Sequence, residues 1–153
     1  MPALIYPDYA YVPGRTPRHP ESLFEALRKS VGADGIPERL METPAWIAGL
    51  SYLEEGFFWE AHEVLEPVWV ALAPGSDERE LVQALIQLAN ACLKREMGRP
   101  QAVLRICEKT RAHLNSIRVA RVMGQSLSDL QETVQALENQ AHRDMPNWQE
   151  NAK

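Results

Sequence analysis

Long apolar runs and clusters of basic residues are both missing from this chain. No stretch approaches the ~20 consecutive apolar residues of a membrane-spanning helix, and five of the eleven prolines break the first twenty residues, where a secretory signal needs an apolar core. The 16 Lys and Arg residues are outnumbered by 21 Asp and Glu, for a net charge of −5. We therefore expect a cytoplasmic protein with no membrane and no nucleic acid as its partner.

Cysteine is also scarce. Cys92 and Cys107 are the two cysteines of the chain, and each lies among apolar residues of a predicted helix. Two cysteines do not make a disulfide framework, and a zinc site would need further ligands. We interpret both as reduced thiols of the core, since a free cysteine behaves as a small buried hydrophobe.

Alternating strand patterns, a Gly-rich phosphate loop and long internal repeats are absent as well. From Pro20 onward the apolar residues instead recur at spacings of three and four, as on one face of a helix. Thr43 and Pro44 read as an N-cap followed by proline at the first helical position. The pattern predicts helices over residues 23–31, 45–55, 57–73, 78–97 and 101–119, and from about 127 or 129 to 141.

These helices predict an all-α, single-domain bundle of about five to six mostly antiparallel helices, because short connections favour antiparallel neighbours. An apolar fraction of 45% in 153 residues is enough for one sizeable core. We divide the chain into an extended arm rich in Pro and Tyr (1–19), the bundle (20–142) and a polar tail (143–153).

The arm has two interpretations. Its three tyrosines, Tyr6, Tyr9 and Tyr11, need a surface to lie on. The arm either packs along its own domain or crosses to a second subunit and forms a homo-oligomer. His19, with two arginines before it, is either part of a solvated cluster or a group that holds an anion or a carboxylate.

The segment FFWEAHEVLEPVW (57–69) concentrates polar groups on a helix whose apolar sector faces the core. His62 and Glu66 lie one turn apart on one flank, whereas Glu60 and Glu63 lie on the other, so the polar groups do not all meet at one point. Pro67 removes an amide donor from the helix interior, which predicts a kink and frees the carbonyl group of Glu63. The segment also carries two tryptophans, Trp69 beside the His62 flank and Trp59 opposite the core face, where we expect it to be exposed.

Metal motifs are not found here. The HExxH and ExxH patterns of metal-binding helices are both absent. His62 and Glu66 are weak candidates for ligands, and we expect no metal and no cofactor. A histidine at the edge of an apolar face is more often a hydrogen-bonded boundary residue.

The next helix has a polar stripe in which amides outnumber charges. It consists of Arg79, Gln83, Gln87, Asn90 and Lys94. A fully solvated face more commonly carries Glu and Lys, so an amide-rich stripe predicts a partly buried surface where each side chain needs a hydrogen-bond partner. Antiparallel packing then places Arg79 near Glu66 or near the end of the first helix, and Gln87 closer to Glu60 and Glu63. The result is a buried Glu/His/Arg/Gln network between the two central helices.

These two helices resemble a bacterial and archaeal family, domain of unknown function family 309. The resemblance covers roughly residues 50–115 and rests on two elements: EAHE…LE..W, which includes Glu60–Glu63 and Trp69, and QALIQ at Gln83–Gln87. It implies an all-α bundle and no established activity. Family members often have QGLIQ at the second element and often have His where this chain has Lys94, which removes one potential metal ligand.

Two functions remain open at this point. The first is a binding or interaction module with a structural network, in which Glu60, Gln83, Gln87, Trp59 and Trp69 contact a ligand or partner. The second is an enzyme, hydrolase-like and conceivably metal-assisted, acting on a small polar substrate. In that case Glu63 or Glu66 is the base, and His62 or Arg79 assists it.

Overall fold

The structure of the chain is a computed structural model, which describes residues 6–146. The described residues form seven α-helices, a single 3₁₀ turn and two very short strands. In chain order these elements are η1 (Glu21–Phe24), α1 (Glu25–Lys29), α2 (Pro37–Leu40), α3 (Pro44–Glu55), α4 (Phe58–Ala71), α5 (Asp77–Glu96), α6 (Pro100–Asn115), β1 (Arg121–Val122), β2 (Gln125–Ser126) and α7 (Leu127–Asp144).

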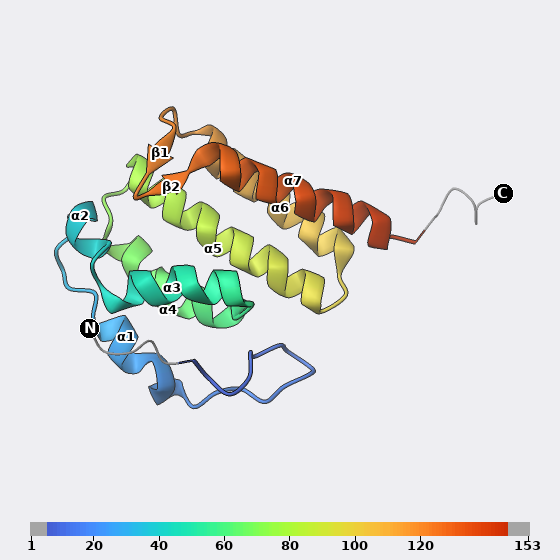
Figure 1. Ribbon diagram of the computed structural model, residues 1–153, viewed down its shortest axis with the longest axis horizontal. Coiled ribbons are helices and arrows are strands. Elements are labelled where there is room, and N and C mark those ends of the chain that lie inside the picture. The colour runs from blue at the N-terminus through green and yellow to red at the C-terminus, as the bar shows by residue number, and fades with distance from the viewer. Residues whose placement is uncertain (1–5, 147–153) are drawn as a thin grey trace.

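The all-α, single-domain fold is confirmed (Figure 1). Each of the helices α3 to α6 packs against the helix that follows it, and α5 lies in the middle of the bundle between the α3–α4 pair and the α6–α7 pair. These five helices have 12 to 20 residues each, and α1 and α2 are shorter additions. Helix α7 continues to Asp144, so its last two residues fall in the predicted tail, and residues 147–153 lie outside the described part.

Helix ends follow the signals in the sequence. The Oγ1 of Thr43 accepts a hydrogen bond from the backbone N–H of Trp46 at 3.3 Å, and Pro44 is the first residue of α3, as predicted. Ser76 caps α5 in the same way, with 3.1 Å to the N–H of Arg79. Gly56 ends α3 at a φ of 88°, a conformation that favours glycine. Only two residues therefore separate α3 from α4.

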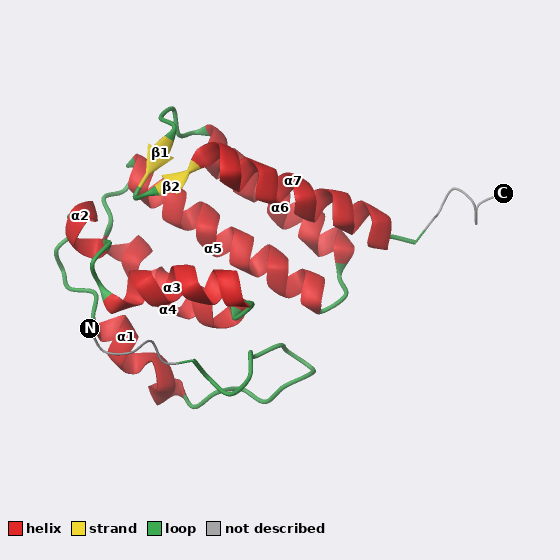
Figure 2. Cartoon of the chain, in the orientation of Figure 1, coloured by secondary structure: helices red, strands yellow, loops and turns green. Residues whose placement is uncertain are grey.

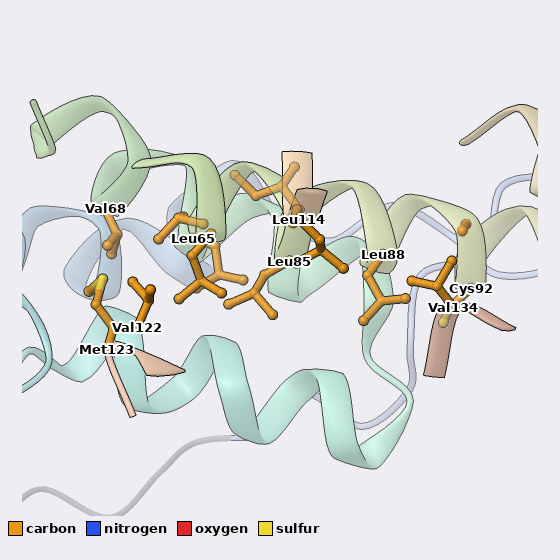
Figure 3. Close-up of a cluster of buried hydrophobic side chains, with 14 of the residues drawn as sticks. Leu65, Val68, Leu85, Leu88, Cys92, Leu114, Val122, Met123 and Val134 are labelled. Carbon is orange, nitrogen blue, oxygen red and sulfur yellow. The ribbon is translucent and has the colours of Figure 1, made fainter. Parts of the chain in front are cut away.

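The core is built mainly from the apolar faces of α4 to α7 (Figure 3). Leu65 of α4 and Leu85 of α5 are 0% and 2% exposed, and Leu114 and Val134 bring α6 and α7 onto the same centre. No helix within residues 6–146 combines the length and the apolar character needed to cross a membrane.

A small β-hairpin between α6 and α7 was not predicted (Figure 2). Arg121 pairs with Ser126, and Val122 pairs with Gln125. Met123 and Gly124 form the turn at φ values of 48° and 77°, which is the geometry of a tight hairpin turn. Strands of two residues are too short to show alternation in the sequence. The hairpin buries Val122 and Met123 against the bundle.

Both cysteines are reduced residues of the core, as expected. Burial raises the pKa of the Cys92 thiol and of the Cys107 thiol to about 11. At pH 8 only about 0.1% of each thiol is then ionised. We predict that neither cysteine reacts with a chromogenic aromatic disulfide in the folded protein at pH 8, and that both react once denaturant unfolds it.

The same shift predicts a pH dependence of stability. The folded-state pKa of about 11 lies above the value of 9.0 expected for an accessible thiol. The raised pKa of the two thiols should therefore contribute to the free energy of unfolding below pH 9. This contribution should be lost as the pH rises toward 11. Rapid reaction of either thiol in the folded protein at pH 8 would contradict the assignment of the two cysteines to the buried core.

The loop before α2 packs tightly against the end of α4. A Cβ atom on Gly35 would lie 2.2 Å from the carbonyl oxygen of Ala71, a backbone atom. We predict that Gly35→Ala lowers the free energy of unfolding by about 1–3 kcal/mol, the usual range for overpacking. Gly32→Ala is the matched control, because its Cβ would meet nothing nearer than 4.0 Å. Equal effects of the two changes on urea denaturation would show that the loop is not tightly held.

Candidate functional site

Glu60, the first residue of the EAHE element, points into the protein toward the N-terminal arm. Its side chain is 0% exposed. The backbone N–H of Tyr11 donates to Glu60 Oε2 at 2.7 Å, and His19 Nε2 donates to the same oxygen at 2.7 Å. The other oxygen, Oε1, is buried without a hydrogen-bond partner among the described residues. The prediction that Glu60 lies beside Gln87 is therefore wrong, because the arm takes that carboxylate.

The arm lies along its own domain, beside α3 and α4 (Figure 1). The Tyr6 ring packs against Phe57, with 5.5 Å between ring centroids, and the Tyr11 ring lies 5.1 Å from the Trp59 ring. His19 is 9% exposed and stacks on Tyr9 at 4.7 Å. These contacts agree with the first interpretation of the arm, in which it packs along its own domain. They also show that His19 holds a carboxylate.

Trp59 is not exposed, contrary to prediction. Its side chain is partly buried, and it packs against Phe24 of η1 as well as against the arm. The helical wheel placed Trp59 opposite the core face. It did not show that the arm and η1 form a second apolar layer on that side, around Phe24, Tyr52, Ala61 and Val64. This second cluster needed long-range contacts that local periodicity does not report.

Burial beneath the arm also affects Tyr52. This tyrosine is 0% exposed, and burial, with a further contribution from the charge of Glu60, raises the pKa of its hydroxyl to about 12. The phenol therefore stays protonated at any physiological pH. The layer under the arm thus combines a buried carboxylate, a buried imidazole and a neutral phenol.

Glu63 leaves the helix on the side of α1. Its Oε2 accepts a hydrogen bond from Arg28 at 3.1 Å, and both side chains are about one-third exposed, at 28% and 31%. Arg28 also donates to the carbonyl oxygen of Glu21 at 3.3 Å. The predicted contact of Glu63 with Gln87 is wrong. Arg28 belongs to a segment that sequence reasoning treated only as an amphipathic helix.

His62 is the polar residue of α4 that does reach α5. Its Nδ1 lies 2.9 Å from Oδ1 of Asn90, and because the amide oxygen accepts, the ring donates from Nδ1. Its Nε2 lies 3.4 Å from Oε2 of Glu66, one turn further along. We expected the amides of the stripe on α5 to form hydrogen bonds with α4. Among the described residues, Asn90 is the only amide of the stripe that does so.

Arg79 contacts the end of α4 but not Glu66. Its guanidinium lies over the ring of Trp69, 4.2 Å from the centroid, and donates to the carbonyl oxygen of Leu72 at 3.2 Å. Gln83 and Gln87 are partly buried, as predicted for the stripe. Neither side chain forms a hydrogen bond with another described residue. The continuous Glu/His/Arg/Gln network between α4 and α5 is therefore replaced by separate contacts on different sides of α4.

A cleft of about 640 Å³ runs along the outer side of α4. The residues that line it come from α4, from α1 and from the loop at residues 31–33. They include Arg28, Val31, Glu63, Glu66, Pro67 and Val70. Helix α4 continues through Pro67 to Ala71, but Pro67 has no N–H, so the Glu63 carbonyl in this wall lacks its usual helical donor. Val70 is 61% exposed at the rim.

The cleft combines charge with apolar surface. Glu63 is paired with Arg28, whereas the side chain of Glu66 is 55% exposed, and its Oε2 lies 3.4 Å from His62 Nε2. Such a surface can bind a small molecule through hydrogen bonds and apolar contact. Within residues 6–146, no group of three or more His, Cys, Asp and Glu residues is arranged to hold a metal ion.

The buried contacts of Glu60 generate a prediction about stability. Glu60→Ala leaves the His19 ring and the Tyr11 N–H buried without their acceptor, which should lower the free energy of unfolding by about 3–5 kcal/mol. Glu63→Ala removes a partly exposed ion pair of the same helix and should cost less than about 1 kcal/mol. Urea denaturation of both variants gives the comparison.

A second readout separates the arm from the bundle. Trypsin should cut the Glu60→Ala variant after Arg15 or Arg18, both exposed, faster than it cuts the wild type and Glu63→Ala, because the arm has lost its main polar anchor. Equal stability and equal cleavage of the two variants would contradict the role of Glu60.

Comparison with known proteins agrees with the resemblance seen in the sequence. Residues 46–106 match the family described as Domain of unknown function (DUF309). The match runs from Trp46 in α3 to Ile106 in α6, so it includes the whole of α4 and α5, whereas Tyr11, His19 and Arg28 lie before it. Searches of curated proteins and of solved structures gave no match. The helices that carry the EAHE and QALIQ elements thus lie in the segment that is similar to the DUF309 family.

Proposed function

We propose that this chain is a cytoplasmic binding module for a small molecule, and that its binding site is the cleft on the outer side of α4. One observation carries the proposal. Glu63 and Glu66, two glutamates of the segment that matches the family, line the same cleft of about 640 Å³ beside the exposed Val70. Cleft volumes of about 300–1,000 Å³ are typical of small-molecule sites.

The remaining polar residues of α4 support this choice of site by having other partners. Glu60 anchors the arm, and His62 connects α4 to Asn90 of α5. Among the glutamates of α4, Glu66 has the most exposed side chain, at 55%. A carboxylate at a cleft edge, without a close donor, is available to a ligand.

The enzyme alternative has less support. It requires His62 or Arg79 to assist Glu63 or Glu66. The cleft is lined by the two glutamates, but neither His62 nor Arg79 is among its lining residues. The ring of His62 faces Asn90, and the guanidinium of Arg79 lies over Trp69. We therefore propose binding without a reaction, and the two free buried thiols fit a reducing compartment.

Oligomerisation through the arm stays a prediction. The contacts that would carry it, those of Tyr11 and His19 with Glu60, form within one chain here. An exchange of arms between two copies would preserve the same contacts across a symmetric interface.

A test of the proposal fills the cleft. Ala33 is exposed and lines the cleft, so Ala33→Trp should occupy it and leave the helices intact. We predict that fragments from a library of mixed charge shift the amide resonances of Gly32, Glu66 and Val70 in the wild type, and that Ala33→Trp abolishes these shifts. The measurement is a two-dimensional ¹H–¹⁵N correlation spectrum for each fragment.

The control adds the same side chain elsewhere. Val119 is 50% exposed in the connection between α6 and β1, so Val119→Trp should retain the shifts at the cleft. Fragments that bind only at other surfaces, or shifts that persist in Ala33→Trp, would overturn the proposal.

A further inference from the structure

We infer that the cleft on α4 selects small organic cations, namely a primary ammonium or guanidinium group carried on a short apolar body. This inference rests on the proposed binding function and names the class of ligand. It is argued from the groups that line the cleft, and not from the acidic character of the chain as a whole.

Hydrogen-bond acceptors predominate in the cleft. Two acidic residues line it, Glu63 and Glu66. Pro67, which also lines the cleft, has no N–H to donate to the backbone carbonyl of Glu63 one turn earlier in α4. The charged donor is Arg28, whose guanidinium is already engaged by Glu63 Oε2 at 3.1 Å and by the Glu21 carbonyl at 3.3 Å. A ligand that brings donors and positive charge therefore complements the cleft better than one that brings acceptors.

Arg28 itself shows that a cation is accommodated there. Its guanidinium lies against Glu63 within the wall of the cleft, so the chain already places one positive group on one of the two carboxylates. With this pair neutralised, the cleft retains the negative charge of Glu66. The neighbour that the structure gives Glu66 is the His62 ring, whose Nε2 lies 3.4 Å from Glu66 Oε2. A second cation can bind Glu66 without displacing Arg28.

The apolar wall of the cleft determines the part of the ligand that does not carry the charge. Val70 is 61% exposed, and Val31, Pro67 and Ala71 continue the apolar lining from it. Covering these side chains removes apolar surface from water, which favours binding of an alkyl or aryl body. A bare metal ion or a free ammonium ion would leave this wall exposed, so we infer an amphiphilic cation.

Four matched probes test the inference. n-Butylammonium and n-butylguanidinium carry the cation, whereas n-butanol and butyrate are four-carbon molecules with no charge and with a negative charge. We expect both cations to bind the cleft about tenfold more tightly than n-butanol, and butyrate to bind most weakly. Chemical-shift titration at low salt measures each affinity, and raising the salt concentration should weaken only the cations.

Variants separate charge from shape. Glu66→Gln keeps the size of the side chain and should remove most of the preference for cations over n-butanol. Glu54→Gln, an exposed glutamate of α3 outside the cleft, should leave it unchanged. Binding of n-butanol or butyrate as tight as that of the cations, or an unchanged preference in Glu66→Gln, would overturn the inference about ligand class.

The two proposals fail in different ways. If neutral or anionic probes bind the cleft and Ala33→Trp blocks them, the binding function stands and the cation class is wrong. If no probe shifts the residues of the cleft at concentrations of about 20 mM, far above the affinity range of useful fragments, the inference is wrong. In that case the fragment screen alone decides the binding function.

Discussion

The burial of α4 on several sides is the constraint on which the rest of the structure depends. A surface helix hides one face and leaves the opposite face to water. Helix α4 has apolar residues on its core face but also carries Trp59 and Glu60 on other sides. The arm and η1 cover these two residues, and the arm supplies the two hydrogen bonds that the buried carboxylate of Glu60 accepts.

This covering explains how the polar residues of one short segment come to have different roles. The arm reaches Glu60, α1 reaches Glu63, and α5 reaches His62. Each is satisfied by a different neighbour. His62 points away from Glu60 and Glu63, because residues one or two positions apart on a helix do not share a face, and Glu60 and Glu63 lie one turn apart, where they meet the arm and α1. Only Glu66 and the paired Glu63 are left to line open space, and so the cleft becomes the place where a ligand can bind.

The family match fits this division of roles. It covers α4 and α5 and begins after the segments that supply Tyr11, His19 and Arg28. The buried carboxylate of Glu60 therefore lies in the matched segment, whereas the groups that compensate its charge lie in the N-terminal part. Removing a carboxylate from water requires hydrogen-bond donors in its place, so the matched segment and the arm depend on one another energetically.

Local signals predicted much of the fold. The helices from α3 to α7 follow from apolar spacing, from the N-cap at Thr43 and from the turn at Gly56, which act within one or two turns of the chain. The partial burial of the amide stripe on α5 also followed, because side-chain type reflects exposure. The hairpin at Val122 and Met123 was missed, since two-residue strands have no pattern of their own.

Contacts between residues that lie far apart in the sequence could not be predicted by the same reasoning. The sequence by itself determined that Glu60 and Glu63 leave α4 on one flank and that His62 and Glu66 leave it on the other, because the helical repeat is fixed by backbone geometry. The tertiary structure decided which neighbouring element contacts each of these side chains. His19 lies 41 positions from Glu60 and Arg28 lies 35 positions from Glu63, and contacts over such separations depend on how the arm and α1 pack, which no local pattern encodes.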